Sequence, residues 1–201
     1  MENNNYEEAM ALLERILKVE PEIKQKETIT EKNKEFLVRY SILKESSSTK
    51  TILKNIKEDI TAIGTYEQQY PAVKQAEVTL QKRYNRFNSL RSRSSNPFNN
   101  KFLEFLKWWY DRTDKDGNRC CYYCGVKEFE SETAFDTKKI DSKKFSGKLQ
   151  IDRKDSEGAY SEENCVFACV LCNNAKSDMI SAKDFKVYFG EATKKFWEHI
   201  K

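Results

Sequence analysis

The sequence predicts a mainly α-helical protein that ends in a small core of two strands and a helix, held together by a four-cysteine metal site. Three observations predict this fold class. Apolar residues recur at helical spacing along most of residues 1–95. Two Cys-x-x-Cys pairs stand at Cys121 and Cys124 and at Cys169 and Cys172. Between these pairs, and just past the second, the residue pattern indicates strand, loop, strand and helix in succession.

The composition fits a chain with two parts. Of its 201 residues, 34% are charged and 38% are hydrophobic, which is enough for packed helices with solvated outer faces. We place the boundary in the Ser-rich run before Pro97, which gives a helical region at 1–95 and a cysteine-containing domain at 96–201. The formal net charge of +4 is too small to identify a polyanion binder by itself.

The sequence predicts a cytoplasmic protein with no membrane partner. No stretch approaches the roughly 20 apolar residues that a membrane-spanning helix needs. The N-terminal run MENNNYEEAM lacks the basic start and the apolar run of a secretory signal. Thiols stay reduced in the cytoplasm, which favours metal ligands or buried thiols over disulfides for the six cysteines.

Apolar stripes predict several helices in the first part of the chain. They run through Met10–Leu17, Phe36–Leu43 and Ile52–Ile63. A longer helical segment is expected from Pro71 towards Leu90. Such faces predict a helical bundle that packs on itself or on a second copy of the chain.

A basic strip lies at the end of this helical region. Residues 79–95 contain no acidic residue, and Tyr84 and Phe87 are interleaved with the charges. Contact with a phosphate backbone and a solvated helix face explain the strip equally well. The run Phe98–Tyr110 then predicts an aromatic helix whose rings are mostly core. The basic residues of the strip are Lys82, Arg83, Arg86, Arg91 and Arg93.

The two Cys-x-x-Cys pairs predict a structural zinc site. Each pair fits a tight knuckle in which both sulfurs face one ion, and four thiolates complete a tetrahedral Zn2+ site with no position left for water. Two cysteines remain outside the pairs. Cys165 falls on a predicted strand and reads as a small core residue, and Cys120 is a spare candidate ligand.

Two runs in the second domain are typical of one nuclease family. From Ile151 the sequence reads I-D-R-x-D…G-x-Y-x-x-x-N-C-V, and the second cysteine pair continues as C-x-x-C-N-x-x-K, which ends at Lys176. Over Arg119–Phe189 the chain resembles the HNH nucleases, in particular their zinc-bound subgroup. The resemblance implies a ββα fold that enters the minor groove of DNA and holds one divalent ion, Mg2+ or Mn2+, over the scissile phosphate.

The resemblance implies a role for four residues by their position in these runs. Asp152 and Asn173 would bind the catalytic ion. Asn164 would hold the loop between the strands through hydrogen bonds to the backbone, and Lys176 would neutralise a phosphate. A carboxylate and an amide oxygen suit a hard ion and leave positions for water and phosphate.

Arg153 stands where the family has the histidine that acts as general base. A guanidinium cannot take a proton from water, but it can clamp a phosphate oxygen and stabilise developing charge. Three alternatives follow: an active enzyme whose proton passes to solvent, phosphate or a carboxylate; a fold kept for DNA binding alone; or a site completed by His199, the one histidine of the chain. The candidate carboxylates are Asp155, Glu157 and Glu163.

The sequence therefore predicts a metal-dependent endonuclease that hydrolyses DNA phosphodiester bonds with water as the nucleophile. The alternative is a catalytically degenerate HNH-fold zinc protein that binds nucleic acid without cleaving it. A purely structural zinc protein would leave the basic strip without a role. A homodimer would bring one core to each DNA strand, although nothing in the sequence establishes it. Restriction, homing and phage defence remain open as settings.

Overall fold

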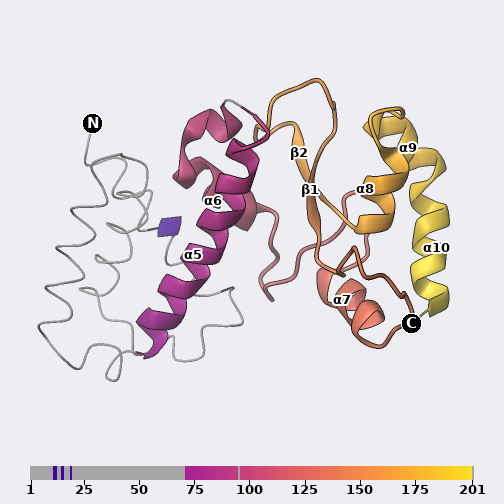
Figure 1. Cartoon of the computed structure of the whole chain (residues 1–201), viewed down its shortest axis with the longest axis horizontal. Helices are drawn as coiled ribbons and strands as arrows, with labels where there is room; N and C mark the ends of the chain where they lie inside the picture. The colour runs from indigo at the N-terminus through magenta and orange to yellow at the C-terminus, as the bar shows by residue number, and fades with distance from the viewer. Residues whose placement is uncertain (1–10, 13–14, 16–18, 20–70, 95, 201) are drawn as a thin grey trace, which may run out of the picture. The chain divides into compact units, whose positions relative to one another are not determined.

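A computed structural model of the chain describes residues 11–12, 15, 19, 71–94 and 96–200 (Figure 1). The chain divides into two compact units, each described here by itself. The N-terminal unit ends at Asp111 and includes Lys115–Gly117, and the C-terminal unit comprises Arg112–Asp114 and Asn118–Lys201. The aromatic helix that the sequence assigned to the second domain thus falls in the N-terminal unit. The three apolar stripes predicted before residue 70 lie outside the described residues.

The described part of the N-terminal unit is built on an aromatic core. The long helix expected from Pro71 is α5 (Pro71–Arg91), followed by a 3-10 helix, η2 (Pro97–Asn100), and by α6 (Phe102–Asp111). Phe87 of α5 packs on Phe105 of α6, with ring centroids 5.5 Å apart. The rings of α6 are buried, as the sequence predicts.

None of the helices in the described ranges has the length and apolar character that crossing a membrane requires.

The aromatic helix begins later than predicted. Phe98, Asn99 and Asn100 have φ angles of 49°, 52° and 57°, so a right-handed helix cannot run through them. Asparagine tolerates this left-handed region, whereas a bulky residue is strained in it. Phe98 is held by its packing, since its ring centroid lies 5.3 Å from those of both Phe105 and Trp108.

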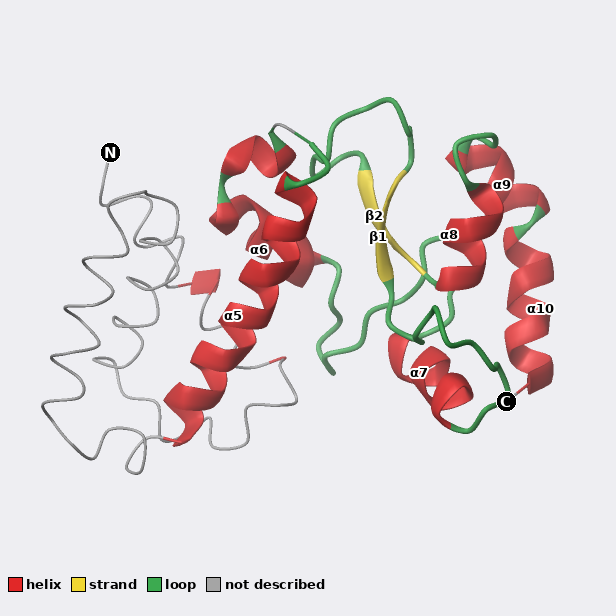
Figure 2. Cartoon of the chain, viewed as in Figure 1, coloured by secondary structure: helices red, strands yellow, loops and turns green. Residues whose placement is uncertain are grey.

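The predicted strand, strand and helix core is present in the C-terminal unit (Figure 2). β1 (Gln150–Arg153) pairs antiparallel with β2 (Cys165–Ala168), residue for residue, with the first of β1 opposite the last of β2. α8 (Val170–Lys176) follows directly, starts slightly before Cys172 and contacts β1. β2 is buried throughout, whereas β1 keeps partly exposed positions that can carry a site.

A helix that the sequence did not predict, α7 (Glu128–Asp136), lies between the first cysteine pair and β1. Its buried positions are two small residues, so it carries no apolar stripe that periodicity could detect. Glu128 joins three segments: its carboxylate pairs with Arg119 at 2.6 Å and accepts the N–H of Leu149 at 3.0 Å. These contacts tie the first cysteine loop to the entry of β1.

Helices α9 (Ala182–Tyr188) and α10 (Gly190–Ile200) complete the C-terminal unit. The hydroxyl of Ser181 caps α9 by accepting the backbone N–H of Asp184. α9 ends at Tyr188, and Gly190 is the first residue of α10. A Cβ at this position would lie 2.5 Å from the carbonyl oxygen of Tyr123, so the close approach requires glycine.

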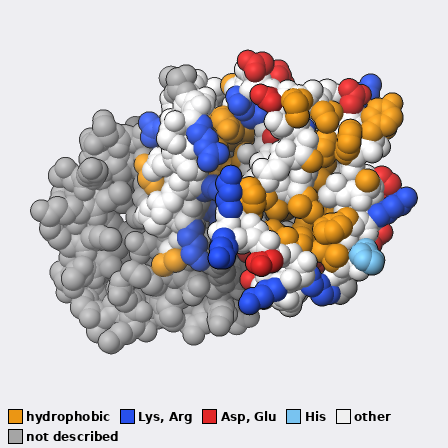
Figure 3. Space-filling view, turned by 45° about the vertical axis from the view of Figure 1, so that its right-hand side comes forward, with side chains coloured by type: hydrophobic (Ala, Val, Ile, Leu, Met, Phe, Trp, Pro, Cys, Tyr) orange, Lys and Arg blue, Asp and Glu red, His pale blue; other side chains and the backbone are white. Residues whose placement is uncertain are grey.

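Part of the apolar surface of this unit is exposed (Figure 3). Trp197 packs on the core and is 3% exposed, whereas its neighbour Phe196 is 42% exposed. Adjacent residues on a helix point about 100° apart, so only one of the two faces the core. The other exposed apolar side chains at or near α9 are Met179, Val187, Tyr188 and Phe189.

Candidate active site

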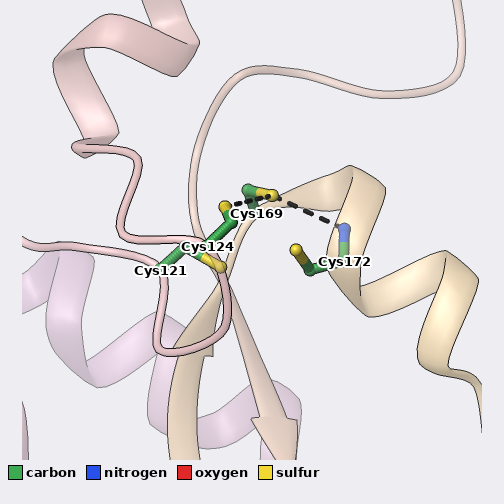
Figure 4. Close-up of side chains that lie close together, drawn as sticks. All are labelled: Cys121, Cys124, Cys169 and Cys172. Atoms are coloured by element: carbon green, nitrogen blue, oxygen red, sulfur yellow. Dashed lines mark hydrogen bonds between the residues drawn. The ribbon is translucent and has the colours of Figure 1, made fainter. Parts of the chain in front are cut away.

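The four cysteines predicted as metal ligands come together (Figure 4). Cys121 and Cys124 project from the loop before α7, and Cys169 and Cys172 lie at the N-terminal end of α8. All four are buried, and their sulfurs lie within 4.8 Å of one another. Gly125 has a φ of 77°, which lets the first loop turn back behind Cys124.

The geometry and the donor set of this cysteine group fit a zinc ion. Zn–S bonds of about 2.3 Å in a tetrahedron place the sulfurs about 3.8 Å apart. The sulfurs of Cys124 and Cys169 are 3.8 Å apart. Hydrogen bonds with Cys121 and the other sulfurs raise the pKa of the Cys172 thiol, and a bound cation would lower it. Four thiolates leave no position for water, so such an ion supports the fold and does no chemistry.

The two remaining cysteines lie outside this group. Cys165 is fully buried on β2, as predicted for a small core residue, and burial raises the pKa of its thiol to about 12. Cys120, the spare candidate ligand, is exposed, and its backbone bridges to that of Lys127. Within the described ranges, the metal-binding group is formed by the two Cys-x-x-Cys pairs alone.

A second group of polar side chains lies between β1 and α8 and is here called the Asp152 cluster. Residues two apart on a strand share a face, as do residues three apart on a helix. The side-chain amide of Asn173 donates to Oε1 of Gln150. The ammonium of Lys176 lies 3.5 Å from Oδ2 of Asp152. The cluster consists of Tyr123, Gln150, Asp152, Asn173 and Lys176.

The charges of Asp152 and Lys176 are largely shielded from solvent. The side chain of Asp152 is 11% exposed and that of Lys176 is 1% exposed. Burial raises the pKa of Asp152, while the hydrogen bond from Tyr123 and the charge of Lys176 lower it. Lys176 also donates to the carbonyl of Ser177 at 3.1 Å. The sequence predicted Lys176 as a phosphate contact, whereas the structure buries its ammonium beside Asp152.

Tyr123 is, with Gln150, one of two members of the cluster that the sequence did not predict. Its hydroxyl donates to Oδ2 of Asp152 at 2.5 Å. Burial and the neighbouring carboxylate raise the pKa of Tyr123, so the phenol keeps its proton and acts as a donor. Its ring packs edge-on against Phe185, with centroids 5.2 Å apart. Its position between Cys121 and Cys124 could have indicated this role from the sequence. Two metal ligands that flank a side chain fix the backbone, and hence the direction in which that side chain points.

Asn164 makes the backbone hydrogen bonds that the resemblance implies. Its side-chain oxygen accepts the N–H of Asp155, and its amide donates to the carbonyls of Asp155 and Ala159, all at 2.9 Å. Gly158 lies against this amide, since a Cβ there would be 2.7 Å from Nδ2 of Asn164. The side chain of Asn164 therefore fixes the conformation of the loop between the strands through hydrogen bonds to the loop backbone.

Arg153 lies on the face of β1 opposite to Asp152, because adjacent residues of a strand point to opposite sides. Its guanidinium donates to the carbonyl of Gly158 at 2.8 Å and lies 4.8 Å from the centroid of the Tyr160 ring. These contacts brace the loop that Asn164 holds. The phosphate contact expected of Arg153 stays a prediction.

The candidate proton acceptors lie on the surface. Asp155 and Glu157 are exposed on the loop, where Asp155 accepts the N–H of Glu157 at 3.0 Å. Glu163 is exposed as well, and its carboxylate accepts hydrogen bonds from its own backbone N–H and from Ser161, which lower its pKa. His199 is exposed near the end of α10, where Figure 3 shows it in pale blue. This position gives no support to a site completed by His199.

The predicted basic strip lies on α5 and the turn after it. The guanidinium of Arg83 lies 4.5 Å from the centroid of the Trp109 ring, so this residue packs on α6. Contact of the strip with DNA stays a prediction. Arg91 and Arg93 are exposed, and Arg83 and Arg86 are partly buried.

The two strands, the helix after them and the four-cysteine group form the ββα core that the sequence predicts. No family model matches the sequence, and no curated protein matches it. Among solved structures, the chain is similar to the rare-cutting HNH restriction endonuclease PacI, with 25% sequence identity and a TM-score of 0.48. The match covers 60% of this chain and 80% of that chain.

Proposed function

We propose that this protein is a metal-dependent endonuclease that hydrolyses phosphodiester bonds of DNA. The observation that carries the proposal is the Asp152 cluster. In it, Lys176 of α8 pairs with the carboxylate of Asp152 on β1, and the amide of Asn173, one turn earlier on α8, bonds to Gln150 on the same face of β1. The sequence runs that build this cluster resemble those of HNH nucleases. Carboxylate and amide oxygens are the ligands that hard divalent ions prefer.

Asp152 and Asn173 would hold Mg2+ or Mn2+. When bound, such an ion neutralises charge on the scissile phosphate and makes water a better nucleophile. Tyr123 fixes the orientation of the Asp152 carboxylate, and Lys176 balances its charge. Arg153 remains a candidate phosphate contact, because a guanidinium has five donors and the carbonyl of Gly158 occupies one.

Zn2+ in the four-cysteine group would have a structural role. DNA is the partner that this proposal requires. The cytoplasmic location and the homodimer stay predictions.

The proton of the attacking water has no histidine to receive it in this cluster. Solvent, the phosphate itself and the exposed carboxylate of Asp155 are the acceptors left. Loss of a general base typically costs about two to four orders of magnitude in rate. We therefore expect slow cleavage.

A protein that binds nucleic acid without cleaving it is the second candidate. The observation in its favour is the ion pair between Lys176 and Asp152. An ammonium beside the carboxylate competes with a divalent cation for the same charge.

Supercoiled plasmid incubated with the zinc-loaded protein tests the proposal, with Mg2+, with Mn2+ and without either ion. We expect nicking or linearisation that requires the divalent ion. Asn173→Ala should abolish it, and so should Asp152→Asn combined with Lys176→Met. The double variant removes the carboxylate without leaving a buried ammonium unpaired.

Zinc content and circular dichroism show whether these variants are folded. Cleavage that survives in the folded double variant would rule out Asp152 as an ion ligand. If no ion supports cleavage and the wild-type protein still retains the plasmid in a gel shift, the second candidate replaces the first.

A further inference from the structure

The C-terminal unit carries a basic surface that none of the predicted DNA contacts includes. It is the segment 137–149 between α7 and β1, here called the lysine loop. Asp141 is its one acidic residue, and all of its lysines are exposed. These lysines are Lys138, Lys139, Lys143, Lys144 and Lys148.

The backbone of the lysine loop is anchored at several points. Near its start, the N–H of Ile140 donates to the carbonyl of Ala134 at 3.1 Å. Near its end, Gly147 lies so close to α7 that a Cβ there would be 2.4 Å from the Cα of Glu132. Its last residue, Leu149, is buried, and the N–H of Leu149 donates to the carboxylate of Glu128 on α7. The lysines are thus presented from an ordered backbone, which reduces the entropy lost on binding.

The lysine loop leads directly into the Asp152 cluster. A strand advances about 3.4 Å per residue, so the backbone of Lys148 lies within about 14 Å of that of Asp152. Each strand of duplex DNA carries one phosphate per about 3.4 Å of helix axis. If a phosphodiester bond is cut at Asp152, phosphates a few nucleotides away therefore come within reach of Lys148, and the other lysines of the loop extend the same basic surface.

We propose that the lysine loop holds the phosphate backbone of duplex DNA beside the cleavage site. The inference rests on the proposed nuclease function and adds a binding surface to it. Lysine is a compact charge on a flexible stem and suits phosphate, whereas the planar side chains of Arg, Asn and Gln suit bidentate contacts to base edges. Segment 137–149 contains none of these three residue types. We therefore expect the contact to position the DNA and to add little sequence preference.

The test measures binding of the full-length, zinc-loaded protein to a short fluorescent DNA duplex across a salt series, without Mg2+ so that no cleavage occurs. The loop variant carries Lys143→Gln, Lys144→Gln and Lys148→Gln. The control carries Lys183→Gln, Lys194→Gln and Lys195→Gln, which removes the same charge from exposed positions on α9 and α10. Each lost phosphate contact should reduce the slope of log affinity against log salt by about 0.9. At low salt, we expect the affinity for the duplex to fall at least about tenfold in the loop variant and to stay unchanged in the control.

Plasmid cleavage with Mg2+ is measured in parallel, and unchanged zinc content confirms folding. A loop variant that binds and cleaves like the wild type overturns the inference and leaves the nuclease intact. Equal losses in both variants also overturn it, because net charge would then explain the effect. A loop variant that binds duplex DNA like the wild type but binds duplex RNA less well would reassign the surface to RNA and overturn it too. If the wild type does not cleave, the nuclease proposal fails on its own.

Discussion

Two donors converge on one oxygen of Asp152. The hydroxyl of Tyr123 lies 2.5 Å from Oδ2, and the ammonium of Lys176 lies 3.5 Å from the same atom. Partners that orient a metal ligand commonly set its affinity for the ion almost as strongly as the ligand itself does. At the scale of single residues, these two side chains are therefore expected to control how the cluster binds a divalent ion.

Replacing Tyr123 by Phe removes the hydroxyl and keeps the ring that packs on Phe185. We expect the cleavage rate or the affinity for Mg2+ to fall by about 10–100-fold, because the carboxylate loses one of its two fixed partners. Titration of plasmid cleavage with Mg2+ measures both quantities. Tyr122→Phe is the matched control, since this neighbouring tyrosine is 39% exposed. Equal effects in the two variants would show that Tyr123 does not position Asp152.

The buried ion pair of Lys176 and Asp152 predicts strong coupling in a double-mutant cycle. Lys176→Met and Asp152→Asn should each lower the free energy of unfolding by about 3 kcal/mol or more, because each leaves the other group buried and less well paired. The double variant should recover most of this loss. Denaturant unfolding of the four proteins measures the coupling. Additive losses would mean that the two charges do not depend on each other in the folded chain.

At the scale of elements, β1 and α8 carry the cluster, and α7 supports both the lysine loop and the entry of β1. Gly147 is the tightest of these contacts, because a Cβ there would lie within 2.5 Å of three backbone atoms of α7. The residues of α7 that make this approach are Ser131 and Glu132. They lie about one turn after Glu128, whose carboxylate accepts the N–H of Leu149. The loop and the strand are thus positioned by the same helix.

Gly147→Ala is expected to destabilise the C-terminal unit by about 1–3 kcal/mol, the usual cost of forcing an extra methyl group into packed structure. The lysine loop should also become more accessible to trypsin, which cleaves after lysine. Thermal unfolding and limited proteolysis measure the two effects. Ser146→Ala, at the exposed neighbouring position, should change neither. A Gly147→Ala protein as stable and as resistant as the wild type would contradict the close approach to α7.

The sequence predicted β1, β2 and α8 because strand and helix periodicity and two cysteine pairs mark them independently. It could not predict α7, whose buried face consists of small residues. Glu128 of this helix makes an ion pair with Arg119 before the helix and accepts a hydrogen bond from Leu149 after it. Asp152 and Asn173 were found from the motif. Tyr123 was not, since its role depends on a contact across 29 positions of sequence. Likewise, the burial of Lys176 follows from packing that a local pattern does not contain.

At the scale of the whole molecule, the four-cysteine group joins distant parts of the C-terminal unit. The segment between its two pairs contains α7, the lysine loop and both strands. A sheet of two four-residue strands is too small to be stable alone in water. A bound ion that fixes both ends of this segment would therefore contribute a large share of the stability of the core.

Removal of zinc should unfold this core. We expect about one zinc ion per chain, and Cys172→Ser should lose it and lower the free energy of unfolding by about 4 kcal/mol or more, as loss of a structural metal does. Cys120→Ser, at an exposed thiol outside the group, is the matched control and should keep both the zinc and the stability. Metal analysis and thermal unfolding test this, with a thiol reagent reporting on the buried cysteines before and after chelation. Buried thiols that stay unreactive in the chelated protein would show that packing alone holds the core, and the ββα fold would then not depend on the ion.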